Sequence, residues 1–208
     1  MMPRFVAIIP AAGHSRRMGQ PKLLLEFGGQ SVLSRVVQTL LGAGLSRCIV
    51  VVRPGDLALA HAAELAGAEV VMPVVAPIDM RQSVECGLRQ GLLTTPAYDG
   101  WVLVPADHPT LNPAVIRELI TAWQASPTRI AVPVFEGRRG HPTIFPWGLV
   151  PEILALPPNC GLNQLLRSQP ERVLEVSVSD RRVLDDLDTP EDWKRLLLDD
   201  QSSMKPLD

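Results

Sequence analysis

Short apolar runs rich in β-branched residues recur along the chain and predict strands. The runs cover residues 5–9, 48–52, 69–72, 101–104, 130–134 and 173–178. Several of them are almost continuously apolar, as the strands of a parallel sheet are when helices cover both of its faces. The pattern therefore predicts a buried and mostly parallel sheet.

Helical patterns lie between these runs, and several of them begin at residues that cap helices well. The predicted caps are Ser31, Asp79, Asn112 before Pro113, and Thr189 before Pro190. Gly42 and Gly44 can end the helix that starts after Ser31. Strands that alternate with helices predict an α/β domain, and such domains bind ligands beyond the carboxyl ends of their strands. The loops that follow strands are therefore the candidates for function.

A length of 208 residues suffices for one domain with its own core, and we expect that domain to cover residues 1–198. Residues 199–208 are predicted to form a flexible polar tail. The net charge of −2 gives no general attraction for a polyanion. The apolar run at 5–9 is too short for a signal peptide or a membrane span. We therefore expect no nucleic acid and no membrane as partners.

The three cysteines, Cys48, Cys86 and Cys160, are far apart and lack the paired spacing of a metal site. Unpaired cysteines suit a reducing compartment. Together with the short N-terminal apolar run, they predict a cytoplasmic protein.

The loop after the first apolar run extends to Lys22 and is the most informative stretch of the chain. Its glycines and its lysine have neither the P-loop spacing nor the dinucleotide-binding spacing. Small residues at Ala11, Ala12 and Gly13 let the backbone approach a ligand, so main-chain N–H groups can bind an anion. Arg17 and Lys22 add positive charge suited to a triphosphate. From the residues alone, a solvated basic loop with turn glycines explains the segment equally well.

A second candidate loop follows the run at 101–104 and places Asp107 in Pro-Ala-Asp-His-Pro. Mg²⁺ takes oxygen ligands from one or two carboxylates and from substrate phosphates, so a carboxylate at the end of a strand suits it. An aspartate close to prolines is also a common turn former, and that alternative needs no metal. The adjacent His108 is weak evidence by itself, and we assign it no catalytic role.

From Ala11 the first loop reads Ala-Ala-Gly-x-Ser-x-Arg-Met-Gly-x-Pro-Lys-Leu-Leu. This segment resembles the signature of the molybdenum cofactor cytidylyltransferase-like nucleotidyltransferases, the MobA/MocA-like NTP transferases. The resemblance implies a Rossmann-like three-layer α/β/α nucleotidyltransferase fold with a mostly parallel central sheet. It also implies that Arg17, Lys22 and Asp107 are catalytic. The residues that would bind the nucleotide are Ala11, Ala12, Gly13, Ser15, Arg17, Lys22 and Ser83, with Arg16 as a weaker candidate.

Ser83 enters this set because Arg81-Gln-Ser-Val, followed by Gly87-Leu88, resembles the segment with which the family opens a nucleotide-contacting helix. A plain amphipathic helix explains the same residues. Gly87 costs such a helix about 1 kcal/mol relative to alanine, so it permits either close packing or the approach of a ligand.

The same resemblance implies a metal site that contains Asp107 and an acidic residue near the C-terminus. Asp186 and Asp188, in Asp-Asp-Leu-Asp-Thr-Pro-Glu-Asp, are both candidates for this second ligand of Mg²⁺. Asp188 and Asp192 also suit a helix start, because acidic side chains offset the positive end of the helix dipole.

Residues 136–142 read Glu-Gly-Arg-Arg-Gly-His-Pro and look like the Gly-x-Arg-Gly-His-Pro element of the family. By this resemblance Arg139, Gly140 and His141 would bind an anionic acceptor, with molybdopterin favoured. A hairpin turn with exposed arginines is the alternative. Residues 158–163 lack the Asp and Arg that family members often have in their place, which leaves the acceptor open.

The reaction implied by the resemblance is attack of an acceptor phosphate oxygen on the α-phosphate of a nucleoside triphosphate, with Mg²⁺ as cofactor and pyrophosphate as product. CTP is favoured because Ala-Ala-Gly stands where the guanylyl branch has Gly-Gly, and the extra methyl groups narrow the base pocket. A molybdoenzyme would then be the client of the product.

Three alternative functions remain open. Two are nucleotidyl transfers to another acceptor, and one is a function without catalysis. Pro10-Ala-Ala-Gly and Arg81-Gln-Ser-Val also resemble the methylerythritol phosphate cytidylyltransferases, although the chain lacks their His-Asp-Ala-Ala-Arg-Pro stretch. Another phosphorylated acceptor is the second alternative. The third is a non-catalytic protein that binds a nucleotide or cofactor and delivers it to a partner.

Overall fold

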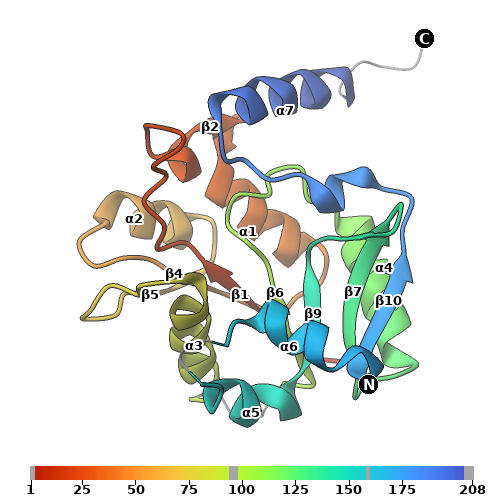
Figure 1. The fold of residues 1–208 in the computed structure, drawn as a ribbon. Coiled ribbons are helices and arrows are strands. Elements are labelled where there is room, and N and C mark those ends of the chain that lie inside the picture. The colour runs from red at the N-terminus through yellow and green to blue at the C-terminus, as the bar shows by residue number, and fades with distance from the viewer. Residues whose placement is uncertain (1–2, 94–97, 158–159, 204–208) are drawn as a thin grey trace.

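An eight-stranded sheet forms the centre of the molecule (Figure 1). The computed structural model describes residues 3–93, 98–157 and 160–203. The strands are β1 (Phe5–Pro10), β4 (Arg47–Val51), β5 (Glu69–Val71), β6 (Gly100–Leu103), β7 (Ile130–Phe135), β8 (Arg138–Arg139), β9 (Thr143–Pro146) and β10 (Val173–Ser177). Their order is β10-β7-β9-β6-β1-β4-β5, and β8 pairs with β7. Strands β2 (Glu26–Phe27) and β3 (Gln30–Ser31) form a separate hairpin.

All six strands predicted from the apolar runs are present, each within one residue of its predicted ends. These six run parallel to one another, because β9 is antiparallel to both β6 and β7. The sequence did not indicate β9. Its four residues, Thr-Ile-Phe-Pro, contain only two large apolar side chains and end in proline, so no extended apolar run marks them.

Helices cover both faces of the sheet, and the sheet separates two hydrophobic cores (Figure 1). Helices α1, α2 and α4 contribute to one core, together with Ala7 and Ile9 of β1. Helices α3, α5 and α6 contribute to the other core, together with Val6 and Ile8. The helices are α1 (Val32–Gly42), α2 (Leu57–Leu65), α3 (Met80–Gly91), α4 (Pro113–Gln124), α5 (Val150–Leu154), α6 (Leu162–Ser168) and α7 (Pro190–Ser203). The predicted Rossmann-like three-layer α/β/α arrangement is confirmed.

Short 3₁₀ turns complete the path of the chain. They are η1 (Lys22–Leu24), η2 (Trp147–Leu149), η3 (Pro170–Arg172) and η4 (Arg181–Leu184). No helix in the described ranges is long and apolar enough to cross a membrane.

The four predicted helix caps are formed by side-chain hydrogen bonds. The backbone N–H groups of Ser34, Gln82 and Ala114 donate to the side chains of the capping residues, at 3.1, 2.8 and 2.9 Å. These capping residues are Ser31, Asp79 and Asn112. At the start of α7, Thr189 Oγ1 accepts from the Asp192 N–H at 3.2 Å while Asp192 Oδ2 accepts from the Thr189 N–H at 2.9 Å. The exchange is a capping box with aspartate as its acidic member.

Helix α7 continues through Ser203, so the segment predicted as a tail, 199–208, begins inside a helix. Residues 204–208 lie outside the described part of the chain. The last apolar residue of α7 is Leu198, and for this reason the sequence pattern placed a boundary after it.

Parallel pairing brings the two predicted functional loops to one edge of the sheet. Strand β1 pairs with β6 through Ile8 and Leu103, so the loops that leave their carboxyl ends are neighbours. The Leu187 N–H donates to the Asp107 carbonyl at 3.0 Å and attaches the segment before α7 to the same edge.

Gly87 lets helix α3 pack closely on the sheet. A Cβ atom at this position would lie 2.7 Å from Ile8 Cγ2 and 3.3 Å from Val51 Cγ2. The structure therefore gives Gly87 a packing role, one of the two roles that the sequence left open.

We predict that Gly87→Ala lowers the free energy of unfolding by about 1–3 kcal/mol, because overpacking outweighs the gain in helix propensity. Urea denaturation measures this change. Gly42→Ala is the matched control, since Gly42 also lies in a helix and a Cβ there would meet nothing within 4 Å. Equal effects of the two substitutions would contradict the packing role.

Candidate active site

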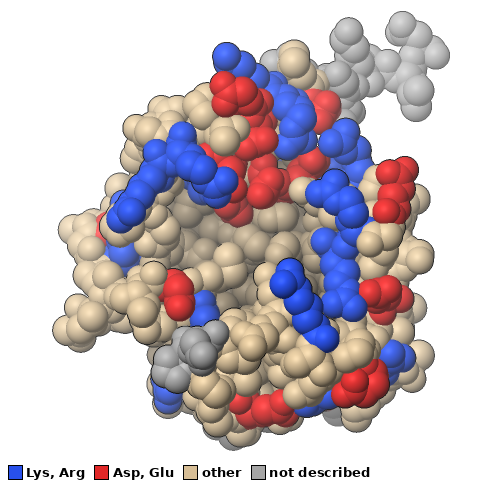
Figure 2. All heavy atoms as spheres, viewed as in Figure 1, with Lys and Arg blue, Asp and Glu red and all other residues tan. Residues whose placement is uncertain are grey.

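A cavity of about 330 Å³ opens at the carboxyl edge of the sheet. Four segments line it: the loop after β1, the start of α3, residues 105–107 and Asp188. Figure 2 shows this face of the molecule hollowed, with acidic side chains gathered at one edge of the hollow and basic side chains on both sides. All the residues predicted to bind the nucleotide or to act in catalysis line this cavity: Ala11, Ala12, Gly13, Ser15, Arg17, Lys22, Ser83 and Asp107.

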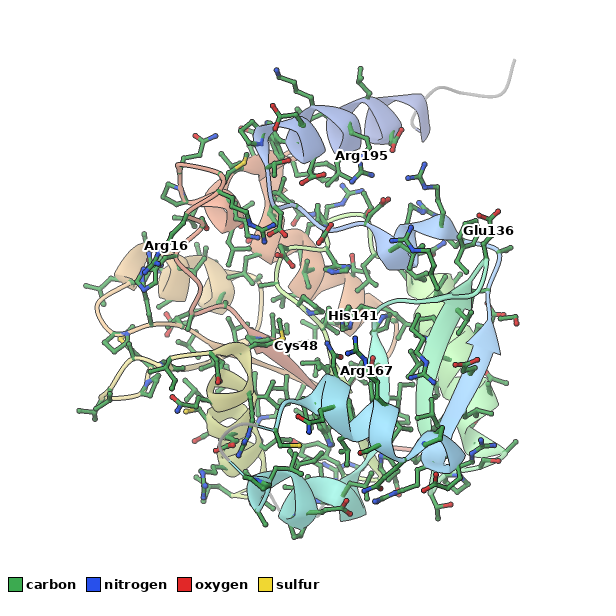
Figure 3. The ribbon with its side chains drawn as sticks, viewed as in Figure 1. Arg16, Cys48, Glu136, His141, Arg167 and Arg195 are labelled. Carbon is green, nitrogen blue, oxygen red and sulfur yellow. The ribbon has the colours of Figure 1, made fainter. Side chains whose placement is uncertain are left out.

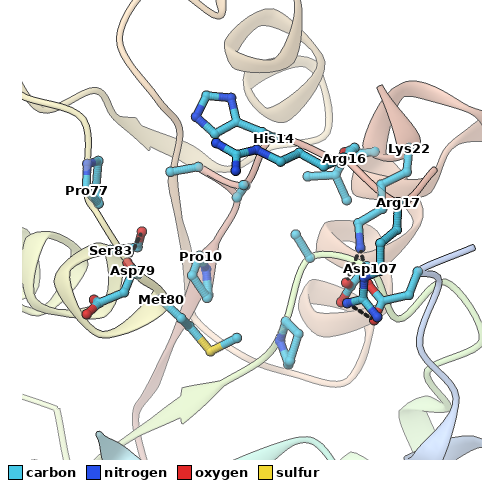
Figure 4. Close-up of a pocket in the computed structure, with 18 of the residues that line it drawn as sticks. Pro10, His14, Arg16, Arg17, Lys22, Pro77, Asp79, Met80, Ser83 and Asp107 are labelled. Carbon is cyan, nitrogen blue, oxygen red and sulfur yellow. Dashed lines mark hydrogen bonds and ion pairs between the residues drawn. The ribbon is translucent and has the colours of Figure 1, made fainter. Parts of the chain in front are cut away.

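An ionic network of two basic and two acidic side chains lies in this cavity. Lys22 Nζ is 2.6 Å from Asp107 Oδ2 and 2.9 Å from Asp188 Oδ1. Arg17 Nη2 is 2.5 Å from Asp188 Oδ2. In Figure 4 the side chains of Lys22 and Arg17 extend toward Asp107, away from Ser83 and Met80 on α3. We call these four residues the charged network.

Burial by itself lowers the pKa of Lys22, but the charges and hydrogen bonds of Asp107 and Asp188 outweigh burial and raise the pKa above its ordinary value. The lysine therefore stays an ammonium ion at neutral pH. Its side chain is only 13% exposed, so water screens these contacts less than it would screen a surface pair.

Backbone geometry explains how the loop after β1 carries its side chains. Ser15 and Gly19 have φ angles of 49° and 71°, in the left-handed region, and the Met18 N–H donates to the Ser15 carbonyl at 3.1 Å. Arg53 Nη1 donates to the Gly13 carbonyl at 2.8 Å. Within the described residues, the N–H groups of Ala12 and Gly13 make no hydrogen bond. They are therefore free to bind an anion, whereas the Ala11 N–H already donates to the Val51 carbonyl.

The structure distinguishes the two aspartates that the sequence left as alternatives. Asp188 lines the cavity and contacts Lys22 and Arg17. Asp186 is exposed and does not line the cavity. Asp185, next to it, is buried and bonded to Arg195 at 2.7 Å. Asp188 is therefore the member of the pair that reaches the network.

Ser83 is buried on the first turn of α3, and its hydroxyl donates to the Asp79 carbonyl at 3.3 Å. Helix α3 therefore brings both its capping end and this serine to the side of the cavity opposite the charged network (Figure 4). The hydroxyl oxygen keeps its capacity to accept a hydrogen bond from a ligand.

The residues predicted to bind the acceptor do not come together in the cavity. Glu136 and Gly137, with φ of 48° and 76°, form a tight turn between β7 and β8. Arg139 on β8 is exposed, with Nε 2.8 Å from Oε1 of Glu175. Gly140 packs on the backbone of η4, because a Cβ there would lie 2.3 Å from the Val183 carbonyl oxygen. The hairpin with exposed arginines, an alternative from the sequence, matches this arrangement.

His141 is the one predicted acceptor residue that approaches the charged network. Its ring packs edge-on against His108, with ring centroids 5.3 Å apart, and His108 Nε2 is 3.9 Å from Asp107 Oδ1. The Nδ1 atoms of both histidines are buried and make no hydrogen bond within the described residues. In Figure 3 His141 lies near the centre of the view, whereas Glu136, at the tip of the hairpin, lies at the edge.

Sequence reasoning missed the contacts that Arg81 makes near the start of α3. Arg81, on the first turn of α3, donates to the Leu156 carbonyl at 2.6 Å and to the Cys160 carbonyl at 3.1 Å. It also contacts Glu85 at 2.7 Å. Two of these partners are backbone carbonyls. Every residue has such a carbonyl, so no sequence pattern could have indicated these contacts. Pro158 and Asn159, part of the segment that departs from the family pattern, lie outside the described residues.

Comparison with known proteins places these features in a family. The description "MobA-like NTP transferase domain" belongs to the family model that matches residues 7–173. The chain belongs to this family of NTP transferases. The resemblance read from the loop after β1 is therefore confirmed, and so is the nucleotidyltransferase fold.

Two relatives match this MobA-like chain over almost its whole length, and a third matches about half of it. Purine catabolism protein PucB of Bacillus subtilis (strain 168) is 30% identical over 206 residues, covering 92% of this chain and 95% of PucB. The crystal structure of Rv0371c from Mycobacterium tuberculosis H37Rv has a TM-score of 0.81 and 30% identity, covering 94% of this chain and 98% of Rv0371c. A 2-C-methyl-D-erythritol 4-phosphate cytidylyltransferase of Saccharopolyspora erythraea is 33% identical over 120 residues, covering 56% of this chain and 54% of that protein.

Nucleotidyltransferases of this family depend on a divalent metal, and another structure of Rv0371c is a complex with manganese. The residues of this chain fit such an ion. Oxygens of Asp107 and Asp188 converge on one cation, the Lys22 ammonium, and carboxylate oxygens are the ligands that hard divalent cations prefer. In the described part of the chain no group of three or more His, Cys, Asp or Glu side chains could hold a metal, so water or phosphate oxygens would complete the coordination of such an ion.

Burial, and then the neighbouring His108, lower the pKa of His141 to about 3. An unfolded histidine has a pKa of about 6.5. Between these values the unfolded chain binds a proton at this residue that the folded chain does not, so stability falls as the pH falls through this window.

We predict that His141→Asn reduces the loss of stability between about pH 6.5 and pH 4.5 by on the order of 1 kcal/mol. Urea midpoints measured at both pH values test this. His61→Asn, on the exposed face of α2 and away from this histidine pair, is the matched control for the substitution itself. An unchanged slope in the His141 variant would show that this imidazole titrates normally in the folded chain.

Proposed function

We propose that this chain is a Mg²⁺-dependent nucleotidyltransferase that transfers CMP from CTP to the phosphate of molybdopterin, with release of pyrophosphate. The observation that carries the proposal is the charged network at the carboxyl ends of β1 and β6. It combines cations suited to a triphosphate with carboxylates suited to a metal, in one cavity. Membership of the MobA-like family supports the reaction type.

Binding of the triphosphate is assigned to the loop after β1. The unbonded N–H groups of Ala12 and Gly13 would donate to phosphate oxygens, and Ser15 adds a hydroxyl. Arg17 and Lys22 would neutralise the β- and γ-phosphates, and Ser83 would contact the nucleoside from α3. Mg²⁺, when held by Asp107 and Asp188, supplies positive charge to the reacting phosphates.

Catalysis then consists of positioning and charge neutralisation. An oxygen of the acceptor phosphate forms a bond to the α-phosphorus of CTP. The bond from this phosphorus to the oxygen that bridges to the β-phosphate breaks, and its electron pair leaves with pyrophosphate. Lys22 and Arg17 lie where they would stabilise the charge of this leaving group. No covalent enzyme intermediate is required.

Support for CTP comes from the methyl groups of Ala11 and Ala12 and from the relative in Saccharopolyspora erythraea, whose name is that of a cytidylyltransferase. Both side chains line the cavity. Tighter binding of GTP or ATP than of CTP in a competition assay would overturn this choice of nucleotide.

For the acceptor we favour molybdopterin, with His141 and Arg139 as contacts and Gly140 as the residue that lets the hairpin approach η4. Arg139 must leave Glu175 to reach a ligand, but an exposed ion pair contributes at most about 1 kcal/mol. A molybdoenzyme is then the client. The free state of all three cysteines agrees with a cytoplasmic location.

A methylerythritol phosphate is the alternative acceptor, favoured by the name and 33% identity of the same relative. Delivery of a bound nucleotide or cofactor without turnover is the alternative from another class. Pyrophosphate release from each of the four ribonucleoside triphosphates with Mg²⁺ separates these proposals. Release that requires CTP and molybdopterin supports our choice, release with 2-C-methyl-D-erythritol 4-phosphate transfers it to that acceptor, and no release with any pair favours delivery.

We predict that Asp107→Asn and Asp188→Asn each lower kcat by about 10²-fold or more, because each removes a carboxylate that faces the reacting phosphates. Asp186→Asn, two residues before Asp188 and outside the network, is the matched control and should keep nearly full activity. Steady-state pyrophosphate release measures all three, and circular dichroism checks that each variant is folded. Loss of activity in the Asp186 variant instead of the Asp188 variant would reverse the assignment.

A further inference from the structure

The Lys22 ammonium lies at the point where the two carboxylates of the proposed metal site converge. Lys22 Nζ is within hydrogen-bond distance of one oxygen of Asp107 and one oxygen of Asp188, at 2.6 and 2.9 Å. The three side chains are mostly buried, with 13%, 21% and 23% exposed. A metal bound to both carboxylates at about 2.0–2.1 Å requires the space that the ammonium occupies. Lysine and metal therefore compete for these two oxygens.

The balance of charge shows when this competition is resolved. The charged network contains two cations, Arg17 and Lys22, and two carboxylates, so it is neutral as it stands. A divalent ion alone would place two further positive charges beside the ammonium and the guanidinium. A triphosphate alone would place its negative charges beside the carboxylates. Each ligand alone leaves partly buried like charges in contact, which is unfavourable.

With both ligands bound, each charged side chain of the network has a partner of opposite charge. The carboxylates of Asp107 and Asp188 then face the metal, while Lys22 and Arg17 face the phosphates. The distance that the ammonium must cover is short, because the loop that holds the triphosphate lines the same cavity as Lys22 (Figure 4).

We propose that Lys22 is an internal placeholder for the divalent cation: it holds the two carboxylates in place until a triphosphate draws the ammonium away and the metal replaces it. The inference rests on the proposed function, since it assumes that the cavity receives a triphosphate. It adds a specific consequence. Lys22 opposes metal binding when no nucleotide is present and favours metal binding when one is.

The decisive measurement is the affinity for Mn²⁺ in the absence of nucleotide. Binding is detected by electron paramagnetic resonance, as the loss of the signal of free Mn²⁺. We expect the wild-type chain to bind Mn²⁺ weakly and Lys22→Met to bind it about tenfold more tightly or better, in the range usual for coupled sites. Arg17→Met should give a smaller gain, because Arg17 contacts only Asp188 and is 71% exposed. An affinity in Lys22→Met equal to or below that of the wild type overturns the proposal.

Arg16→Met is the matched control, because Arg16 lines the same cavity but, within the described part of the chain, makes no ion pair with either carboxylate. Its Mn²⁺ affinity should stay within about twofold of the wild type, a change small against the coupling expected for Lys22. A gain equal to that of Lys22→Met would show that overall charge, not occupancy of the metal position, controls the affinity, and would overturn the proposal. The double variant Lys22→Met/Asp188→Asn is expected to lose the gain in Mn²⁺ affinity. If it keeps the gain, Mn²⁺ binds at another site, and the proposal is overturned.

A thermal denaturation series provides a second readout. Ligands that bind the folded state raise Tm, and at a given concentration a tighter ligand raises it more. Mn²⁺ should therefore raise Tm more in Lys22→Met than in the wild type. If Lys22→Met does not fold, Lys22→Gln keeps polar contacts to the carboxylates without the charge and replaces it in both measurements. Because neither readout involves turnover, a failure of the placeholder is distinguishable from a failure to transfer CMP.

Discussion

Strands β1 and β6 pair in parallel, with Ile8 opposite Leu103, and this pairing brings two loops that are far apart in sequence to one edge of the sheet. Lys22 and Asp107, 85 residues apart, meet there. The same central strand supplies side chains to both hydrophobic cores, so its position is held from both faces. The loop that carries Lys22 therefore leaves a strand that is packed on both of its faces.

Electrostatics give the cavity a different character from the region beside it. The charged network holds two cations and two carboxylates in contact, so their charges neutralise one another. A few ångströms away, His108 and His141 are buried, and burial lowers the pKa of both below the ordinary value. Neutral imidazoles offer hydrogen bonds but little charge. On our proposal the nucleotide side of the site thus works by charge, and the acceptor side near His141 by shape and hydrogen bonding.

Helix α3 packs on the central strand and also lines the cavity. Gly87 allows the helix to lie directly on β1, and Ser83 faces the cavity from its first turn. Arg81 extends from the same turn to the carbonyls that precede α6.

Local features of the sequence determined much of this protein. Apolar runs marked six strands, and the caps at Ser31, Asp79 and Asn112 marked helix starts, because both depend on residues adjacent in the chain. The loop signature from Ala11 to Lys22 identified the family. Only the tertiary structure decided what depends on contacts between distant segments. It inserted β9 between β6 and β7, placed Asp188 and not Asp186 beside Lys22 through the bond from Leu187 to Asp107, and directed Arg139 to Glu175. A sequence pattern states which residues can form a strand or hold a charge, but which side chain of an extended segment faces the site depends on how that segment is attached to the sheet.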